Sequence, residues 1–213
     1  LVLSHGHYDH GDGFGPLLDH TGFTGPVFCH EAACLNRYAI RPGQATRSIG
    51  LDPAVLSRLA RFLTPFKETT RLDQDLLMAA AIPRLPGNLE CVQGFFLDPE
   101  GAFPDPVPDD AFLLLTTAKG VSLILGCCHA GLANTLAHAS ELAETKEFHA
   151  VVGGFHLMDG NEERIAQSVE TLKQYKISKV YAGHCTGEKG LAGLMQALPG
   201  LVQPLGAGAV IEL

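Results

Sequence analysis

Four residues of types that commonly bind metal ions stand within six positions near the start of the chain: His5, His7, Asp9 and His10. Side chains two positions apart in an extended segment point the same way, so His5 and His7 can bind one ion together. Asp9 and His10 follow where the chain begins to turn, and the neighbouring glycines allow the tight backbone that such a turn needs. Imidazole and carboxylate ligands suit Zn²⁺, Mn²⁺ and iron. This density of ligand-type residues favours a metal site over a solvated polar loop.

Three later histidines also stand where a site could be built: His129, His156 and His184. Each follows a short apolar segment and a glycine-containing turn. A catalytic ion takes about three protein ligands and keeps one position open, so the first segment alone does not complete two coordination spheres. Because strand ends in layered α/β folds line a common edge, we expect at least two of these histidines to join the site.

Apolar periodicity and turn residues predict the elements that must position these side chains. Strands are predicted at 1–4, 26–29, 111–117, 121–125, 150–152, 178–181 and 209–213. Helices are predicted at 31–38, from Asp52 until Pro65, and at 132–146, 162–175 and 190–198. The proline-rich segment 98–110 predicts an exposed loop in which Asp109 and Asp110 are solvated. The second half of the chain thus alternates strands and helices, which indicates an α/β fold.

Composition limits the classes of protein that the chain can represent. Its 213 residues are 46% hydrophobic, enough for one sizeable core, so a single domain over 1–213 is expected. A net charge of −8 without a Lys/Arg cluster argues against binding to nucleic acid or to an anionic membrane. The expected partner is therefore a small-molecule substrate, and a homo-oligomer is compatible with the sequence.

The cysteines and the chain ends bear on the compartment. Six cysteines without a C-x-x-C pair indicate free thiols in a reducing environment. The sequence has no apolar stretch long enough for a bilayer and no signal peptide, which makes the cytoplasm the expected location. The sequence opens in an apolar, strand-like run without Met, so we expect an N-terminally truncated domain.

The run from His5 to His10 resembles the H-x-H-x-D-H signature of the metallo-β-lactamase superfamily. This resemblance implies an α/β (α+β) αββα sandwich with a dinuclear metal site, and it implies that the first strands are absent here. The segments 126–131, 153–157 and 183–187 are similar to one branch of the superfamily. That branch includes the archaeal enzyme that condenses a dihydropterin with a ribofuranosyl-aminobenzene phosphate, and many bacterial metal-dependent hydrolases.

The resemblance also implies roles for single residues. It assigns the first ion to His5 and His7, and the second ion to Asp9, His10 and His184, with His129 as the remaining ligand. Many members have a bridging Asp where this chain has Cys127, whose thiol is either a zinc ligand or buried and inert. His156 is expected near the substrate, with ligation left open, and Thr186 is expected to contact the substrate.

The leading hypothesis is a metal-dependent hydrolase that uses a metal-activated water on an ester, phosphoester or similar small molecule. Two divalent ions are expected, zinc first and Mn or Fe as alternatives, with Asp9 as the catalytic residue that orients the water. One alternative is a metal-dependent transferase that condenses a dihydropterin with a ribofuranosyl-aminobenzene phosphate, so the substrate could be phosphorylated or pterin-like. Another is a metal-binding or sensing module without turnover, which Cys127 at the usual Asp position would favour.

Overall fold

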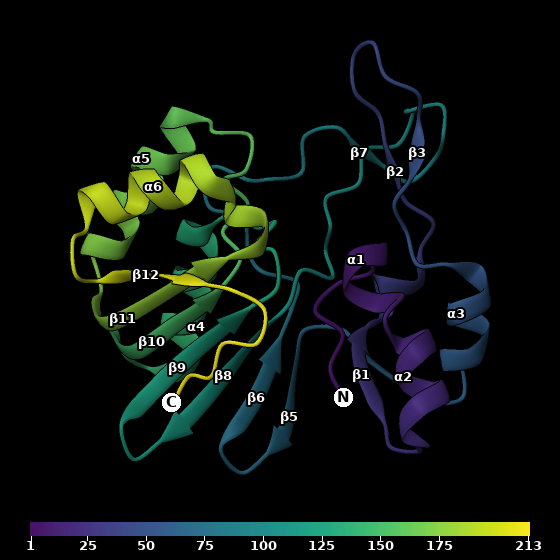
Figure 1. The fold of residues 1–213 in the computed structure, drawn as a ribbon, viewed down its shortest axis with the longest axis horizontal. Helices are drawn as coiled ribbons and strands as arrows, with labels where there is room; N and C mark the ends of the chain where they lie inside the picture. The colour runs from purple at the N-terminus through teal and green to yellow at the C-terminus, as the bar shows by residue number, and fades with distance from the viewer. The chain divides into compact units, whose positions relative to one another are not determined.

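The computed structural model describes residues 1–213, and its backbone contacts divide them into two compact units (Figure 1). Unit 1 comprises Leu1–Glu68 and Val92–Asp109, and unit 2 comprises Thr69–Cys91 and Asp110–Leu213. Each unit buries apolar side chains of its own. The helices are all too short or too polar to cross a membrane.

Unit 1 combines short helices with two small sheets. In chain order its elements are α1 (Tyr8–Gly11), α2 (Phe14–Thr21), β1 (Val27–His30), the 3-10 helix η1 (Glu31–Cys34), β2 (Tyr38–Ala39), β3 (Arg47–Ser48), α3 (Pro53–Leu59), β4 (Leu63–Phe66) and β7 (Phe95–Phe96). β1 and β4 pair in parallel, and β3, β2 and β7 form an antiparallel sheet. Leu3, Val27 and Leu59 are central to its larger apolar cluster.

Local sequence signals explain part of unit 1. The Asp52 carboxylate accepts the Ala54 N–H and Pro53 occupies the first turn, so α3 starts as predicted. The predicted end at Pro65 is wrong, because α3 ends at Leu59 and Leu63–Phe66 pair with β1 as β4. The predicted strand at 1–4 is only an isolated bridge between Val2 and Phe28. The predicted helix at 31–38 is wrong beyond Cys34, because the chain becomes extended at Leu35 and then pairs as β2 with β3 and β7.

Unit 2 is built on one seven-stranded sheet. Its elements are β5 (Thr69–Asp73), β6 (Leu76–Ala79), β8 (Phe112–Thr117), β9 (Gly120–Leu125), α4 (Leu132–Ala143), β10 (Glu147–Gly153), α5 (Glu162–Lys173), β11 (Lys176–Gly183), the 3-10 helix η2 (His184–Thr186), α6 (Gly187–Ala197) and β12 (Val202–Leu205). The strand order is β12-β11-β10-β9-β8-β6-β5, with parallel pairing from β12 to β9 and antiparallel pairing from there to β5.

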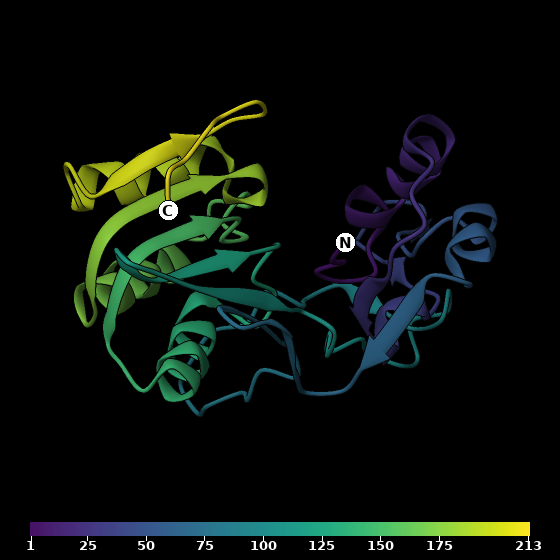
Figure 2. The same ribbon diagram turned by 90° about the horizontal axis from the view of Figure 1, so that it is seen from below.

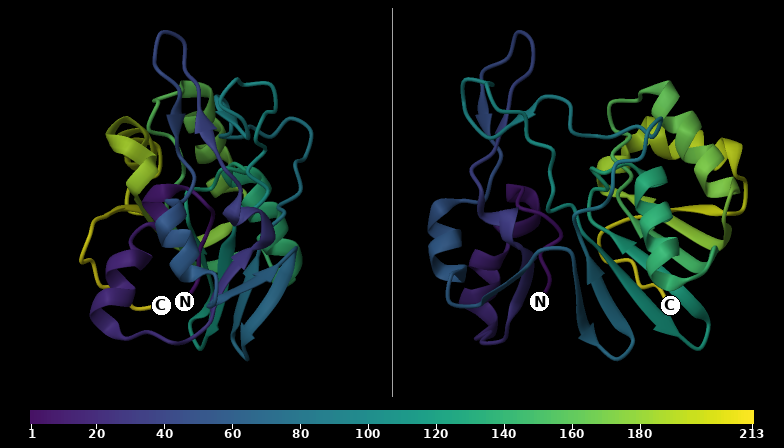
Figure 3. Two further views of the ribbon diagram at one scale, coloured as in Figure 1. Left: turned by 90° about the vertical axis from the view of Figure 1, so that its right-hand side faces the viewer. Right: turned by 180° about the vertical axis from the view of Figure 1, so that it is seen from behind.

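The sequence pattern accounts for this sheet. The predicted hairpin is confirmed as β8 and β9, and helices α4, α5 and α6 connect the parallel strands (Figure 2). The hairpin of β5 and β6 forms one edge of the sheet (Figure 3). The predicted strand at 209–213 is wrong: β12 already forms the other edge, and a turn at Gly206–Ala209 follows it.

The topology determines where the predicted ligands of unit 2 lie. β9, β10 and β11 are parallel neighbours, so their carboxyl ends meet at one edge of the sheet. The segments that follow these strands carry His129, His156 and His184. The predicted α/β fold class is confirmed, since the chain combines a mixed seven-stranded sheet with helices.

Candidate metal centre

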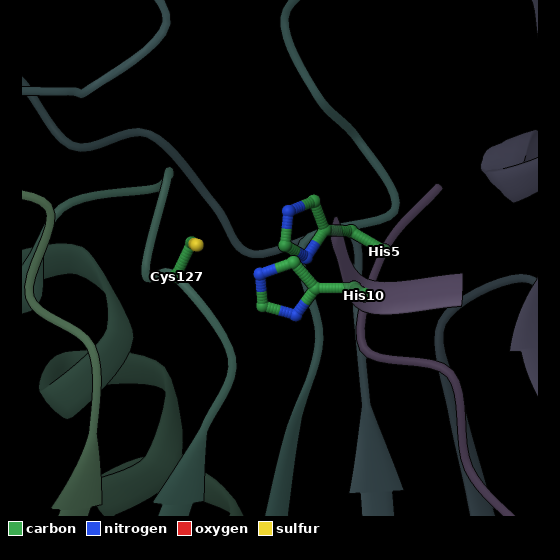
Figure 4. A group of neighbouring side chains, drawn as sticks. All are labelled: His5, His10 and Cys127. Atoms are coloured by element: carbon green, nitrogen blue, oxygen red, sulfur yellow. The ribbon is translucent and has the colours of Figure 1, made fainter. Parts of the chain in front are cut away.

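Unit 1 brings three of the predicted ligands together: His5, His7 and His10. His5 Nε2 lies 3.1 Å from His7 Nδ1, and the His5 and His10 ring centroids are 4.1 Å apart (Figure 4). His5 and His7 are buried, and the Ser4 hydroxyl lies within hydrogen-bonding distance of Nδ1 of both His5 and His10. Ring nitrogens that face one another at this distance fit a shared ion, because two ligands of a tetrahedral zinc ion stand about 3.4 Å apart.

The backbone of this segment is held by a buried ion pair. The Asp109 carboxylate accepts the Gly6 N–H at 2.7 Å and the Arg37 guanidinium N–H at 2.6 Å. Arg37 Nε also lies 3.3 Å from Asp105 Oδ2, and all three charged side chains are buried. At Gly6 an added Cβ would lie 1.9 Å from the carbonyl oxygen of Ala33, so only glycine fits between the two histidines.

The same environment sets the protonation of His7. Burial, followed by the positive charge of Arg37, lowers the pKa of His7 to about 4. The ring is therefore neutral near pH 7 and has a lone pair available for a metal ion. The ring centroid of Phe95 lies 5.1 Å from that of His7 and covers part of the imidazole.

Asp9 and His10 belong to the short helix α1, which begins directly after His7. Asp9 is exposed, and its Oδ2 lies 3.8 Å from His10 Nε2. The carboxylate of the nearby Asp12 accepts the N–H of Asp52 at 2.9 Å, so it connects this loop to the start of α3.

Unit 2 presents its ligand-type residues at the ends of β9, β10 and β11. Cys128, His156 and His184 follow these strands, and each has a positive φ of 60°, 48° and 51°, respectively. This left-handed backbone is unfavourable for residues with a Cβ and is concentrated at functional sites. The segments after the three strands therefore share a strained backbone conformation at or next to the predicted ligands.

Cys127, His129 and His156 gather at this edge, with their potential ligand atoms within 4.8 Å of one another. The His129 and His156 ring centroids are 4.4 Å apart. His129 Nδ1 lies 2.9 Å from the Cys91 carbonyl oxygen, so Nδ1 carries the proton and Nε2 carries the lone pair of the neutral ring. The Asp110 carboxylate accepts the Ala130 N–H at 2.7 Å and thereby fixes the turn after His129.

A second group at the same edge contains Cys127, His184 and Cys185, again within 4.8 Å. Hydrogen bonding to the Cys127 and His156 side chains lowers the pKa of the Cys185 thiol, although burial acts in the opposite direction. The Thr186 hydroxyl is buried and accepts the Phe155 N–H, so it ties the segment before His156 to η2. A substrate contact by Thr186 stays a prediction.

Four residues at these clusters were missed or misjudged from the sequence: Arg37, Asp109, Asp110 and Cys185. Asp109 and Asp110 were expected to be solvated, which is wrong because both are buried and accept backbone N–H groups next to ligand-type histidines. No local pattern signals these contacts, because Asp109 and Gly6 are 103 positions apart. Of these four residues, only Cys185 is marked in the sequence, because it directly follows the predicted ligand His184.

The donor atoms present fit a divalent transition metal. Neutral imidazole, thiolate and carboxylate groups are the ligands that zinc takes in proteins. Each unit contains its own group of such donors: His5, His7 and His10 in unit 1, and the strand-end residues in unit 2.

Comparison with known proteins agrees with this chemistry, although no family model matches the chain. The chain is 33% identical over 198 residues to an uncharacterized protein of Methanocaldococcus jannaschii, covering 92% of this chain and 72% of that protein. It is 25% identical over 221 residues to the 7,8-dihydropterin-6-methyl-4-(beta-D-ribofuranosyl)-aminobenzene-5'-phosphate synthase of the same organism, covering all of this chain and 74% of the synthase.

A solved structure described as a metal-dependent hydrolase of the β-lactamase superfamily matches with a TM-score of 0.81 and 26% identity. The match covers 100% of this chain and 78% of that one. The chain belongs to the metallo-β-lactamase superfamily. Within the superfamily it is similar to the branch that contains the dihydropterin-related synthase, as the sequence motifs predicted.

Proposed function

We propose that this protein is a metal-dependent hydrolase of a small-molecule ester or phosphoester, built as one metallo-β-lactamase-like domain. The proposed metal ligands are His5, His7, Asp9, His10, His129 and His184, for two divalent ions with zinc as the first expectation. The observation that carries the proposal is the cluster of His5, His7 and His10: buried His5 and His7 turn ring nitrogens toward one another, and the partly buried His10 ring lies 4.1 Å from the ring of His5. The structurally similar hydrolase supports the same reaction class.

Divalent ions bound by these ligands would polarise the substrate and lower the pKa of a bound water to about 7. The residues of this chain supply the remaining chemistry. The Asp9 carboxylate is exposed, so it can orient the attacking water and accept its proton at Oδ2. The hydrogen bond from His129 Nδ1 to the Cys91 carbonyl would orient Nε2 as the metal-binding atom, and His156, whose ring lies 4.4 Å from that of His129, is assigned to substrate contact.

The test is the metal content and turnover of His7→Ala and Asp9→Ala. Purified protein is analysed for bound metals and assayed with nitrophenyl esters and phosphodiesters. We expect metal affinity to fall by about tenfold or more in each variant, with turnover lost. His20→Ala is the matched control, because His20 is exposed at the end of α2 and no contact ties it to the cluster. Undiminished metal in His7→Ala would refute the ligand assignment.

A second candidate function is metal-dependent transfer, which the dihydropterin-related synthase favours. In this case the same ligands would hold the ions while a dihydropterin condenses with an aminobenzene ribofuranosyl phosphate. Incubation of the loaded protein with these two compounds distinguishes the reactions. A condensation product without cleavage of any ester supports transfer, and cleavage without condensation supports hydrolysis. Full metal occupancy without either activity would indicate a binding or sensing module.

A further inference from the structure

Two buried thiols, of Cys127 and Cys185, lie at the strand-end edge of unit 2, and neither is among the metal ligands proposed above. Cys127 follows β9, and Cys185 lies in η2 directly after β11. The parallel strand β10 stands between β9 and β11 and places both strand ends at the same edge. The two cysteines are 3% and 5% exposed, so the sulfur atoms are shielded from solvent while the neighbouring His184 is exposed.

The spacing of the donor atoms fits a single ion. Cys127 Sγ, a ring nitrogen of His184 and Cys185 Sγ lie within 4.8 Å of one another, and the Cys185 thiol donates to the Cys127 carbonyl oxygen at 3.5 Å. Two thiolates on a tetrahedral zinc ion, each about 2.3 Å from the metal, stand about 3.8 Å apart. The three donors therefore need only small movements to bind one ion.

The backbone around the sulfur of Cys185 is shaped to admit it. At Gly154 an added Cβ would lie 2.5 Å from Cys185 Sγ and 2.9 Å from the Gly126 carbonyl oxygen. The Gly154 N–H donates to that same carbonyl at 2.9 Å, which holds this segment against the end of β9. A glycine at this position, independently of the donor distances, leaves the space that Cys185 Sγ occupies beside Cys127.

We infer that Cys127, His184 and Cys185 form a thiolate-containing metal subsite in unit 2. This inference rests on the proposed function and deepens it, because the ion assigned to His184 would gain sulfur ligands. Thiolates favour zinc and other borderline-soft ions over Mg²⁺ and Ca²⁺, so the subsite would select the metal. Each thiol that binds releases its proton to solvent, and each thiolate offsets one positive charge of the ion in a buried setting.

Cobalt substitution tests the subsite without relying on activity. Co²⁺ bound by thiolate gives an intense sulfur-to-metal charge-transfer band in the near ultraviolet, which imidazole and carboxylate ligands do not give. We expect this band in the wild-type protein under reducing conditions. Cys185→Ser and Cys127→Ser should each lose roughly half of it, and the double variant all of it. Cys128→Ser is the matched control, because this adjacent buried thiol lies 3.4 Å from the Thr135 hydroxyl instead.

X-ray absorption of the zinc-loaded wild-type protein gives a second measurement that needs no variant to fold. We expect a sulfur shell at about 2.3 Å from zinc. Bound Co²⁺ and Zn²⁺ without any sulfur signal would overturn the subsite and leave the hydrolase proposal standing. A full charge-transfer band in the double variant would overturn it as well. A wild-type protein that binds neither ion would refute the proposed function, and the subsite with it.

Discussion

Asp109 and Asp110 are adjacent in the sequence, and each carboxylate accepts a backbone N–H next to a different ligand-type histidine. Asp109 binds the amide of Gly6, between His5 and His7, and Asp110 binds the amide of Ala130, directly after His129. A buried carboxylate that accepts a backbone N–H restricts the ligand segment without entering the metal site. At the scale of single residues, the backbone next to both groups of ligand-type histidines is therefore held by Asp109 and Asp110.

The Arg37–Asp109 pair gives a direct test of this dependence. Asp109→Asn removes one charge and leaves the buried guanidinium of Arg37 with Asp105 alone, so the free energy of unfolding should fall by about 3 kcal/mol. Urea unfolding measures the loss. Asp19→Asn is the matched control, because Asp19 forms the same type of pair with Arg58 on the surface, at 2.5 Å, where solvent screens it. Equal losses of unfolding free energy in the two variants would contradict the claim that the buried Arg37–Asp109 pair is more important for stability than the exposed Arg58–Asp19 pair.

Protonation of His7 provides a prediction for the metal-free protein. The pKa of His7 is about 4 in the folded state and about 6.5 in the unfolded state, so the unfolded chain binds the proton more readily. The stabilising contribution is present above about pH 6.5 and is lost as the pH falls toward 4. Between pH 7 and pH 5 we expect a loss of about 2 kcal/mol in unfolding free energy, measured by urea unfolding after chelation. His7→Gln should remove this component, and an unchanged pH dependence in that variant would contradict the assignment.

At the scale of elements, the strand ends of unit 2 hold strained backbone at the site. His156 has a φ of 48°, a conformation in which a residue with a Cβ is disfavoured by about 1–2 kcal/mol and glycine is not. We therefore expect His156→Gly to be more stable than His156→Ala by about 1 kcal/mol, measured by thermal or urea unfolding.

The control for this comparison reverses the sign. Glu170 is exposed within α5, where glycine is less favourable than alanine by about 1 kcal/mol. Glu170→Gly should therefore be less stable than Glu170→Ala. If alanine proved better than glycine at position 156 too, the left-handed backbone there would not be held by the fold.

The predictable elements are those whose signals are local. β8 and β9 are two apolar segments joined by a short turn at Lys119, which is a local hairpin signal. α5 begins after Asn161, whose side chain caps the helix by accepting the Arg164 N–H. The segment 31–38 reads as a helix by its apolar residues, but pairing of β2 with β7, which is far away in the sequence, outweighs that local preference. Tertiary pairing of this kind has no signature within the segment itself.

At the scale of the whole molecule, the same distinction applies to the site. Ligand types and motif spacing indicated the metal chemistry and the superfamily, and the structurally similar hydrolase agrees with both. The groups that position the ligands could not be predicted, because the partners are remote: Cys91 for His129, and Asp109 for Gly6. Cys127 and Cys185 lie at one edge because β9, β10 and β11 are neighbours in the sheet, and this strand order cannot be predicted from local sequence patterns.

Each unit contains proposed ligands of its own, so metal binding should stabilise the protein through residues in either unit. A ligand that binds only the folded state adds about 2.7 kcal/mol when its concentration is about a hundredfold above Kd. We expect the melting temperature of the chelated protein to rise on addition of Zn²⁺. The rise should shrink in His5→Ala and in His184→Ala but persist in His20→Ala and His149→Ala, one control for each unit. A full rise in His184→Ala would mean that unit 2 contributes no such ligand through His184, because the loss of a ligand must weaken binding to the folded state.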